Sequence, residues 1–349
     1  MTGATKEDQY ERLLGYIVGN QASWFIDIGL KAGIFRAIAD TGRGIGDGDL
    51  AVSLGFEPRY VGAWCRGAYA FRLLEWDESS GYRLAPHMES LLLDAADPQF
   101  MGGRVQFAVA LFEDYLAFPE YLRSGRVWPR SEHDAFILEA LQNTTKPDCV
   151  MITEQVLPQA PETLQRLETG GEILDVGAGA GHHVIHYATR FPKARVVGLE
   201  PDEPSIELAR RALVEVGLGA RVELRHGDAQ QLDVADAFDL VTMNVTLHET
   251  GEWGDYENVL ARVRRALRPG GTAVVAELPY PDSPAGYRQA PVYQLYAGVQ
   301  LHEALVGCGM ITQGQLRELL VGAGFDEVRV AEQPMPTRFV MLARKGTPP

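Results

Sequence analysis

The pattern of hydrophobic and polar positions changes near residue 170. Before this point apolar residues recur at three- and four-residue spacing, which predicts amphipathic helices, for example over residues 10–38. Beyond it, short apolar runs at 172–176, 195–200 and 237–244 alternate with helical patterns. Strands that alternate with helices predict a largely parallel sheet with helices on its faces.

The amino-terminal part predicts helices followed by a hairpin. A loop with four glycines over residues 41–48 separates the helical segments, and residues 73–84 predict a hairpin that turns at 79–81. Helices followed by a hairpin are typical of a winged helix-turn-helix. We therefore expect a mostly helical winged-helix domain over residues 1–100, a helical linker or lid over 101–165, and an α/β domain over 166–349.

The charge of this region argues against its binding DNA. Residues 26–100 contain seven Lys or Arg and eleven Asp or Glu, and the whole chain carries a net charge of −15 at pH 7. A surface that faces phosphates needs the opposite balance. We expect the region to pair two copies of the chain in a homodimer, with no nucleic acid and no membrane as a partner.

The composition predicts a globular cytoplasmic protein. The 349 residues are 46% apolar and 23% charged, enough for two domains with cores of their own. No apolar run approaches the length of a membrane span, and the N-terminus resembles no signal sequence. The widely spaced Cys65, Cys149 and Cys308 predict neither disulfides nor a zinc ribbon.

A glycine loop follows the first predicted strand. Asp175 closes that strand, and Gly177, Gly179 and Gly181 come next, just before a helical pattern. Glycines at alternate positions let the chain turn sharply and let a ligand lie against the main chain. A dinucleotide-binding loop would need G-x-G-x-x-G, and residue 182 is His, so that fingerprint is excluded.

Polar residues also end the next strands. Glu200 ends the second strand, where a carboxylate can accept both hydroxyl groups of a ribose. Asp228 and Ala229 follow the third strand, and Asn244 ends the fourth.

The glycine loop and these residues together resemble the motif series of class I S-adenosylmethionine-dependent methyltransferases, over residues 170–345. The resemblance implies a Rossmann-like domain with a seven-stranded mixed sheet and S-adenosylmethionine as cofactor. It places Asp175 near the methionine moiety, Glu200 at the ribose and Asp228 at the adenine amino group. The expected cofactor-binding residues are Asp175, Gly177, Gly179, Gly181, Glu200, Asp228, Ala229 and Asn244.

The rest of the domain predicts the elements that such a fold requires. They are a helix over 256–267, a breaker at 268–271, a strand over 272–278, a helix over 313–322, and a closing strand pair over 325–331 and 338–344. In the resembled fold this pair includes one antiparallel strand. The amino-terminal region also fits, because small-molecule methyltransferases use such a module to pair two subunits.

His248 lies just beyond the fourth strand, where ligands collect in open α/β sheets. In one interpretation it is a general base that removes a phenolic proton. Residues 248–253 resemble the His-Asp-Trp region of plant-type small-molecule O-methyltransferases, and Glu277 matches an acid that flanks the base there. The other flanking acid is expected near Met310, where the chain has none.

In the second interpretation His248, Glu249 and His302 bind iron or zinc. The pattern resembles bacterial methyltransferases that act on the β-carbon of α-keto acids, in which a second histidine follows the fifth strand, as His302 does here, 54 residues beyond His248. The metal would stabilise the enolate that attacks the methyl group.

We take metal-dependent C-methylation of an aliphatic or aromatic α-keto acid as the main prediction, serving the biosynthesis of a β-methyl amino acid or natural product. Its catalytic residues are His248, Glu249 and His302. The alternative is a metal-free O- or N-methyltransferase with His248 as base. A non-catalytic regulator that senses the cofactor is a third hypothesis. We expect the remaining histidines of the glycine-loop helix, His182, His183 and His186, to be structural.

Overall fold

The computed structural model describes residues 4–128, 135–251 and 253–347. The chain divides into two compact units. The first comprises Met1–Glu113 and Asp134–Thr144, and the second comprises Asp114–His133 and Thr145–Pro349. The segment expected to be a separate linker, residues 101–165, is therefore divided between the two units.

The first unit consists of helices and one hairpin. Its core is built around Phe35 and Trp64, whose rings meet edge to face with centroids 5.1 Å apart. The predicted hairpin is confirmed, and its strands pair from Leu74 with Leu84 to Asp77 with Gly81. The elements are α1 (Lys6–Lys31), α2 (Ile34–Asp40), α3 (Asp47–Leu54), α4 (Pro58–Ala70), β1 (Leu74–Asp77), β2 (Gly81–Leu84), α5 (Met88–Leu93) and α6 (Gly102–Ala110). Its assignment as a winged helix stays a prediction.

The second unit contains the expected seven-stranded mixed sheet. The strand order is β5-β4-β3-β6-β7-β9-β8, and β9 alone runs antiparallel to both of its neighbours. The prediction of one antiparallel strand in the closing pair is thus confirmed. The strands are β3 (Glu172–Val176), β4 (Arg195–Glu200), β5 (Val222–His226), β6 (Phe238–Asn244), β7 (Leu267–Glu277), β8 (Glu327–Val330) and β9 (Phe339–Arg344).

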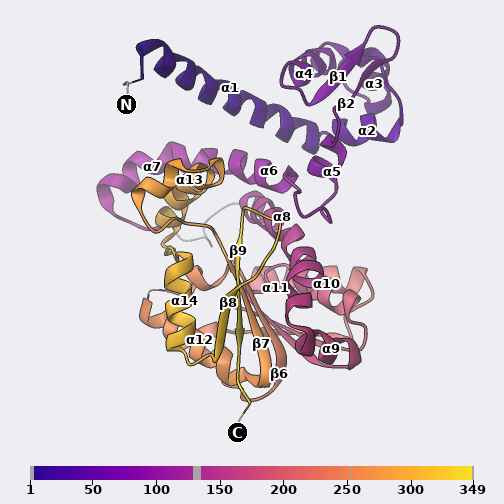
Figure 1. The fold of residues 1–349 in the computed structure, drawn as a ribbon. Helices are drawn as coiled ribbons and strands as arrows, with labels where there is room; N and C mark the ends of the chain where they lie inside the picture. The colour runs from indigo at the N-terminus through magenta and orange to yellow at the C-terminus, as the bar shows by residue number, and fades with distance from the viewer. Residues whose placement is uncertain (1–3, 129–134, 252, 348–349) are drawn as a thin grey trace. The chain divides into compact units, whose positions relative to one another are not determined.

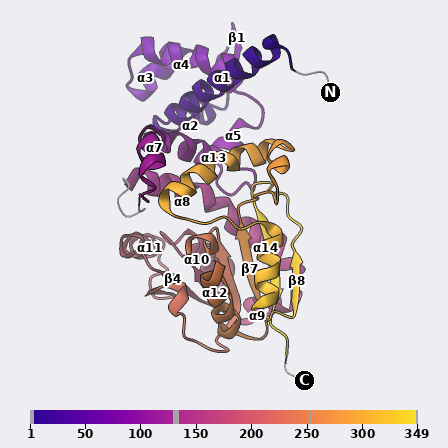
Figure 2. The same ribbon diagram turned by 90° about the vertical axis from the view of Figure 1, so that its left-hand side faces the viewer.

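Helices cover both faces of this sheet, as Figures 1 and 2 show. Two buried clusters of apolar side chains, one on each face, fill the space between helices and strands. One face carries α9 (Pro161–Thr169), α10 (His182–Arg190) and α11 (Glu203–Glu215), and the other carries α12 (Trp253–Ala266) and α14 (Gln313–Gly322). Because β3, β4, β5, β6 and β7 are parallel, their carboxyl ends lie at one edge of the sheet, where the predicted site residues gather.

Strand β7 begins five residues earlier than the predicted strand at 272. The glycines stay within the strand because the main chain of Lys345 pairs with them. The amide of Gly270 donates to the carbonyl of Lys345 at 2.7 Å, and the amide of Lys345 donates to the carbonyl of Gly271 at 3.0 Å. A shift in register against β6, between Phe238 and Leu240, accommodates the additional residues. Pairing across the sheet thus extends the strand through a predicted breaker.

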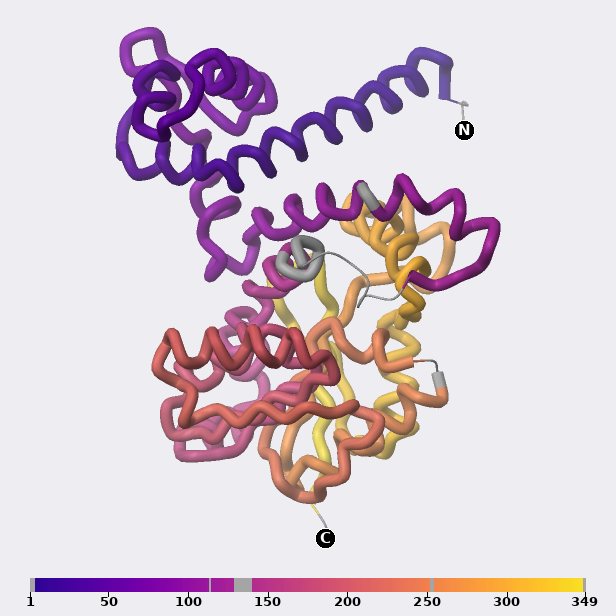
Figure 3. The backbone as a smooth tube through the Cα atoms, turned by 180° about the vertical axis from the view of Figure 1, so that it is seen from behind, coloured from indigo at the N-terminus to yellow at the C-terminus, as the bar shows by residue number. Residues whose placement is uncertain are grey.

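Several further segments lie beside the strand ends. Helix α7 (Phe112–Ser124) lies next to α13 (Pro291–Val306) in Figures 1 and 3. Tyr115 on α7 donates to the carbonyl of Gly298 at 3.0 Å. The other elements are α8 (Ala135–Met151), the π-helical η2 (Ile152–Val156), and the short 3₁₀ turns η3 (Leu157–Gln159), η4 (Ala229–Gln231), η5 (Leu247–Glu249) and η6 (Pro284–Arg288). Within the described part of the chain, no helix combines the length and apolar content that crossing a bilayer requires.

Candidate active site

The glycine loop folds back onto the end of the neighbouring strand. The amides of Gly177 and Ala178 both donate to the carbonyl of Leu199, at 2.8 and 3.1 Å. Gly177 has a φ of +77°, and a Cβ atom there would overlap the side chain of Thr246. Glycine is needed at this position both for the backbone conformation and for the close approach.

We expect Gly177→Ala to lower the free energy of unfolding by more than Gly179→Ala does. Both residues have positive φ, which costs an L residue about 1–2 kcal/mol. A Cβ at Gly179 meets no atom within 4 Å, so that variant isolates the backbone effect. Urea denaturation measures both losses, and S-adenosylmethionine titration measures the effect on binding. Equal losses of unfolding free energy in the two variants would show that the overlap with Thr246 has no effect on stability.

Glu200 ties the end of β4 to the glycine loop. Its carboxylate accepts hydrogen bonds from the amides of Gly179 at 2.8 Å and Asp202 at 3.0 Å. Burial raises the pKa of Glu200, and these two bonds only partly offset that effect. Each carboxylate oxygen has a further lone pair, so the group can still accept the two ribose hydroxyls that the sequence predicts.

A cavity of about 120 Å³ brings four of the expected cofactor-binding residues together. Gly177, Glu200, Asp228 and Ala229 all line it, and Glu249 lies on the same wall. The carboxylate of Asp228 caps the turn η4 by accepting from the amide of Gln230 at 2.7 Å.

Asp175 and Asn244 contribute buried acceptor atoms instead of lining that cavity. Asp175 accepts from the Thr242 hydroxyl at 2.6 Å through one oxygen, and burial raises its pKa. Its other oxygen and the amide oxygen of Asn244 are buried with no hydrogen-bond donor among the described residues. Buried acceptors normally have a donor. The two atoms therefore fit an ammonium group such as the one on the methionine part of S-adenosylmethionine.

A buried ionic network beside this site was not predicted from the sequence. Asp148 on α8 accepts from the Arg338 guanidinium at 2.7 Å and from the Asn244 amide at 3.0 Å. Arg338 also donates to the Tyr296 hydroxyl at 2.9 Å, which links β9 to α13. Burial disfavours the charge on Arg338 and would lower its pKa. The negative charge of Asp148 has a larger effect in the opposite direction, so the pKa of Arg338 is raised. The sequence contains one signal of this network: Arg338 is a single charged residue directly before an apolar run.

His248 lies in the turn η5 with only 1% of its surface exposed. Its Nδ1 is 2.7 Å from a carboxylate oxygen of Glu277, which confirms Glu277 as a neighbouring acid. The other Glu277 oxygen accepts from the amides of Leu247 and His248, at 2.9 and 3.3 Å. Since a carboxylate so placed accepts hydrogen bonds, Nδ1 carries the proton and Nε2 has the lone pair of the neutral ring. His248 Nε2 is buried with no hydrogen-bond partner among the described residues.

The second acid near His248 comes from an unexpected position. Glu303 on α13 places a carboxylate oxygen 3.8 Å from His248 Nε2, and an oxygen of Glu249 is also 3.8 Å away. We had expected this acid near Met310, before α14. Glu303 directly follows His302, and this neighbouring histidine is the one feature of the sequence that could have pointed to Glu303. Of the segment compared with the His-Asp-Trp region, residue 252 lies outside the described residues.

The three acids determine the protonation of His248. Burial is the largest single influence and disfavours the charged ring. Glu277, Glu303 and Glu249 together outweigh it and raise the pKa of His248 to about 9.

The expected metal-binding trio is not brought together. His302 Nε2 is 2.9 Å from a carboxylate oxygen of Asp114 on α7, so this histidine is hydrogen-bonded to a buried acid. Over the residues that the structure describes, no group of three or more His, Cys, Asp or Glu side chains is placed to hold a metal ion.

The histidines at the start of α10 have protein surroundings as well. His186 bonds the Thr153 hydroxyl at 2.9 Å, and His183 lies 3.2 Å from the carbonyl of Thr145. Burial lowers the pKa of His182 and of His186 to about 4.

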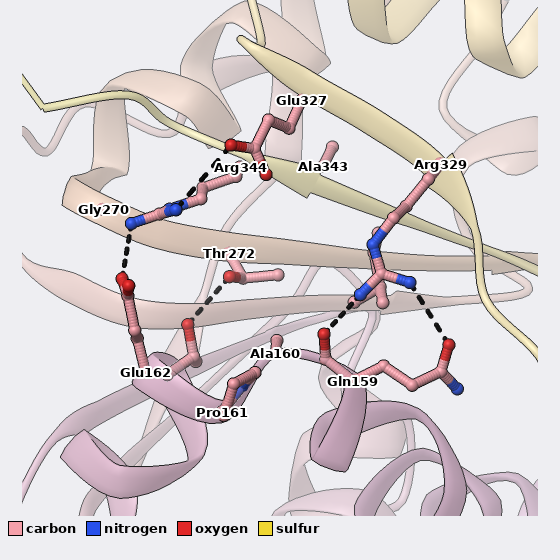
Figure 4. Close-up of a pocket in the computed structure, with 12 residues that line it drawn as sticks. Gln159, Ala160, Pro161, Glu162, Gly270, Thr272, Glu327, Arg329, Ala343 and Arg344 are labelled. Atoms are coloured by element: carbon pink, nitrogen blue, oxygen red, sulfur yellow. Dashed lines mark hydrogen bonds and ion pairs between the residues drawn. The ribbon is translucent and has the colours of Figure 1, made fainter.

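Figure 4 shows a second hollow, of about 250 Å³, near the start of β8 and the end of β9. Its arginines are already paired. Arg344 lies between Glu162 and Glu327, and Arg329 bonds Gln159. Thr272 lines this hollow, five residues before Glu277 on β7, so the hollow lies away from the strand end that carries Glu277.

Comparison with known proteins agrees with this geometry. Residues 173–271 match the family model described as a methyltransferase domain. Over 120 residues the chain is 39% identical to a malonyl-[acyl-carrier protein] O-methyltransferase of Xylella fastidiosa, a stretch that covers 34% of this chain and 38% of the relative. Over 128 residues it is 34% identical to a demethylmenaquinone methyltransferase of Listeria monocytogenes, covering 36% of this chain and 52% of the relative. The chain thus spans about half the length, or less, of these relatives.

Solved structures match over nearly the whole chain. An O-methyltransferase family protein from Burkholderia thailandensis superposes with a TM-score of 0.71 at 16% identity, covering 99% of this chain and 100% of that one. Human N-acetylserotonin methyltransferase in complex with S-adenosylmethionine superposes with a TM-score of 0.69 at 19% identity, with the same coverage. At such identities the likeness establishes the fold. Together with the family match, it identifies a class I S-adenosylmethionine-dependent methyltransferase domain in this chain.

Proposed function

We propose that this protein transfers a methyl group from S-adenosylmethionine to a hydroxyl oxygen of a small molecule, with His248 as the general base. The observation that carries the proposal is the position of the two nitrogens of the His248 ring. Nδ1 is hydrogen-bonded to Glu277, while Nε2 is buried and has no hydrogen-bond partner within the described residues. A base of this kind needs one nitrogen fixed and the other directed at the acceptor.

When bound, S-adenosylmethionine supplies an activated methyl group whose transfer leaves a neutral thioether. The protein therefore has to orient the acceptor and remove its proton. His248 Nε2 takes the hydroxyl proton as the oxygen lone pair forms the new bond to carbon, and the electron pair of the broken sulfur–carbon bond stays on sulfur. Glu277 stabilises the imidazolium that results and fixes the plane of the ring.

The geometry supports C-methylation of an α-keto acid less well. That reaction needs a cation to bind the anionic substrate and to stabilise its enolate. Here three carboxylates surround His248, and His302 pairs with Asp114. O-methylation requires no further group.

A methyl-transfer assay separates the two reactions. We expect labelled methyl to pass from S-adenosylmethionine to phenolic or alcoholic acceptors at a rate that a metal chelator does not change. Labelling of carbon in a panel of α-keto acids, lost on chelation, would instead support the metal-dependent reaction. Absence of turnover combined with DNA affinity at physiological salt would favour a regulator.

The pKa of His248 predicts how this activity depends on pH. The base acts when neutral, so kcat/KM should rise as the pH approaches about 9. In Glu277→Gln the rising limb should move to lower pH, because the strongest charge that favours the imidazolium is removed, and the maximal rate should fall. A pH–rate profile tests this, with the exposed Glu318→Gln on α14 as a control. If the rising part of the profile is unchanged in Glu277→Gln, Glu277 does not raise the pKa of His248.

The same pairing affects stability. The pKa of His248 is about 9 in the folded protein, whereas a histidine in the unfolded chain has a pKa of 6.5. The stabilisation of the fold by the charged His248 is therefore fully present below pH 6.5, and it is lost as the pH rises through 9.

We also propose that the protein pairs through α1. Tyr10, Leu13, Leu14 and Ile17 are spaced along one face of this helix and are 68%, 61%, 46% and 61% exposed. A contiguous apolar stripe of this kind is typical of an interface. We expect the double variant Leu13→Asp/Ile17→Asp to sediment as a monomer where the wild type sediments as a dimer. Val52→Asp on α3 is the control, since Val52 is 79% exposed and lies outside this stripe. A dimer that persists in the double variant would refute this interface.

A further inference from the structure

The hydroxyl of Tyr280 is a buried polar group that proton removal by His248 does not use. Tyr280 lies three residues beyond the end of β7 and is only 5% exposed. Its hydroxyl is buried and has no hydrogen-bond partner among the described residues. Buried hydroxyl groups are normally bonded, so an unbonded one calls for a partner that comes from outside the chain.

This hydroxyl lies beside the proposed base. The carboxylates of Glu277 and Glu303 flank the His248 ring, 2.7 Å from Nδ1 and 3.8 Å from Nε2. The hydroxyl of Tyr280 is close enough to be affected by both charges, and burial followed by these charges raises the pKa of Tyr280. The hydroxyl therefore keeps its proton and is available as a hydrogen-bond donor.

The Tyr280 ring is fixed in place. Its backbone bridges to Thr312, and its ring meets that of Tyr296 edge to face, with centroids 6.2 Å apart. The side chains of Leu278, Val245, Val292 and Val299 belong to the same apolar cluster. A ring packed in this way cannot turn its hydroxyl toward solvent, so the donor stays where a bound molecule can meet it.

Unbonded buried atoms follow the sheet edge from strand to strand. In the order β3-β6-β7, Asp175 lies near the end of β3, and Asn244 ends β6. His248 comes just after β6, and Tyr280 comes after β7. Each of the four has a buried polar atom without a partner in the described part of the chain. The first two fit the ammonium group of the cofactor, which leaves His248 and Tyr280 for the methyl acceptor.

The cofactor cavity lies on the other side of this series. Gly177, Glu200 and Asp228, which line it, follow β3, β4 and β5. Strand β6 separates these strands from β7 in the sheet. We therefore expect the partner of Tyr280 to come from the methyl acceptor and not from the cofactor.

We infer, on the basis of the proposed function, that the methyl acceptor carries a second oxygen without a proton, such as a carbonyl, and that Tyr280 donates to it. The hydroxyl that is methylated donates to His248 Nε2 at the same time. A ligand group that only donated to Tyr280 would leave the tyrosine proton buried and unpaired. Hydroxyl compounds that also contain a carbonyl are thus the substrate class that fits both residues.

Ligand pairs that differ in the carbonyl test the inference. We would titrate the three isomers of hydroxyacetophenone, and the three isomers of ethylphenol, into the full-length protein saturated with S-adenosylhomocysteine. The isomers cover three spacings between hydroxyl and carbonyl. For at least one of them, the affinity ratio of ketone to ethylphenol should fall about 5- to 50-fold in Tyr280→Phe, as the loss of a buried hydrogen bond predicts. The exposed Tyr69→Phe on α4 should keep the wild-type ratio.

Unfolding measurements distinguish this role from a structural one. The hydroxyl of Tyr296, in the same cluster, donates to the carbonyl of Thr337 at 2.8 Å. Tyr296→Phe should therefore lower the free energy of unfolding, whereas Tyr280→Phe should not, because it removes a hydroxyl without a partner in the described chain. Equal losses in the two variants would show that the Tyr280 hydroxyl bonds within the protein, and would overturn the inference.

An affinity ratio that is unchanged in Tyr280→Phe for all three isomers would also overturn it. Turnover is measured separately with labelled S-adenosylmethionine. Methyl transfer to oxygen with an unchanged ratio would remove only this inference. A ratio that depends on Tyr280, without transfer to any oxygen, would overturn the proposed function.

Discussion

Replacing His248 with glutamine is expected to lower kcat for methyl transfer by about 10²- to 10⁴-fold, the usual contribution of a positioned general base. The amide cannot take the acceptor proton, and it loses the charge-assisted bond to Glu277 that is 2.7 Å long in the structure. The affinity for S-adenosylmethionine should stay near the wild-type value, because His248 does not line the cofactor cavity. Single-turnover kinetics and calorimetric titration of the cofactor measure the two quantities.

His87→Gln is a suitable control for this experiment. His87 is exposed and belongs to the first unit, so its replacement should leave kcat unchanged. An active His248→Gln variant would exclude His248 as the base. A His248→Gln variant that loses cofactor binding and activity together would show a structural role for the ring instead.

Replacing Arg338 with methionine is expected to lower the free energy of unfolding by about 3–5 kcal/mol, the usual effect of breaking a buried ion pair. The change leaves the carboxylate of Asp148 buried without its guanidinium partner and removes the bond to Tyr296 that holds α13. Urea denaturation followed by circular dichroism measures the loss.

The double variant Asp148→Leu/Arg338→Met separates the uncompensated charge from the loss of packing. It should recover much of the stability, because no charge is then left buried. Arg126→Met, which breaks the exposed pair with Glu120, should have little effect. A single variant Arg338→Met as stable as the wild type would show that the pair contributes nothing.

The parts of the site that could be predicted from the sequence lie at the ends of strands. Gly177, Glu200 and Asp228 each follow a strand whose apolar run marks its end, and parallel strands bring their ends to one edge. The rule that relates strand ends to ligand sites therefore located the cavity that these residues line. Glu277, at the end of β7, was identified from the resemblance to plant-type O-methyltransferases.

The structure does not group the predicted metal ligands into a site among the described residues, because sequence spacing does not fix which way a helical side chain points. His302 and Glu303 are adjacent on α13, yet their side chains face different partners, Asp114 and His248. Successive helical positions differ in direction by about 100°. Sequence spacing placed this pair near the site but could not decide which of the two residues faces His248.

By itself, the sequence determined the class of fold and the cofactor, and it placed His248 at the end of the fourth strand. Each of these depends on local patterns: apolar periodicity, glycines with positive φ, and polar residues at strand ends. Only the tertiary structure decided which buried groups are paired. It joined Asp148 to Arg338 across 190 positions of the chain and Asp114 to His302 across 188. A buried charge has to find an opposite charge or a hydrogen-bond partner, and packing, not sequence distance, selects it. That selection paired His302 with Asp114 and placed the carboxylates of Glu277 and Glu303 beside His248.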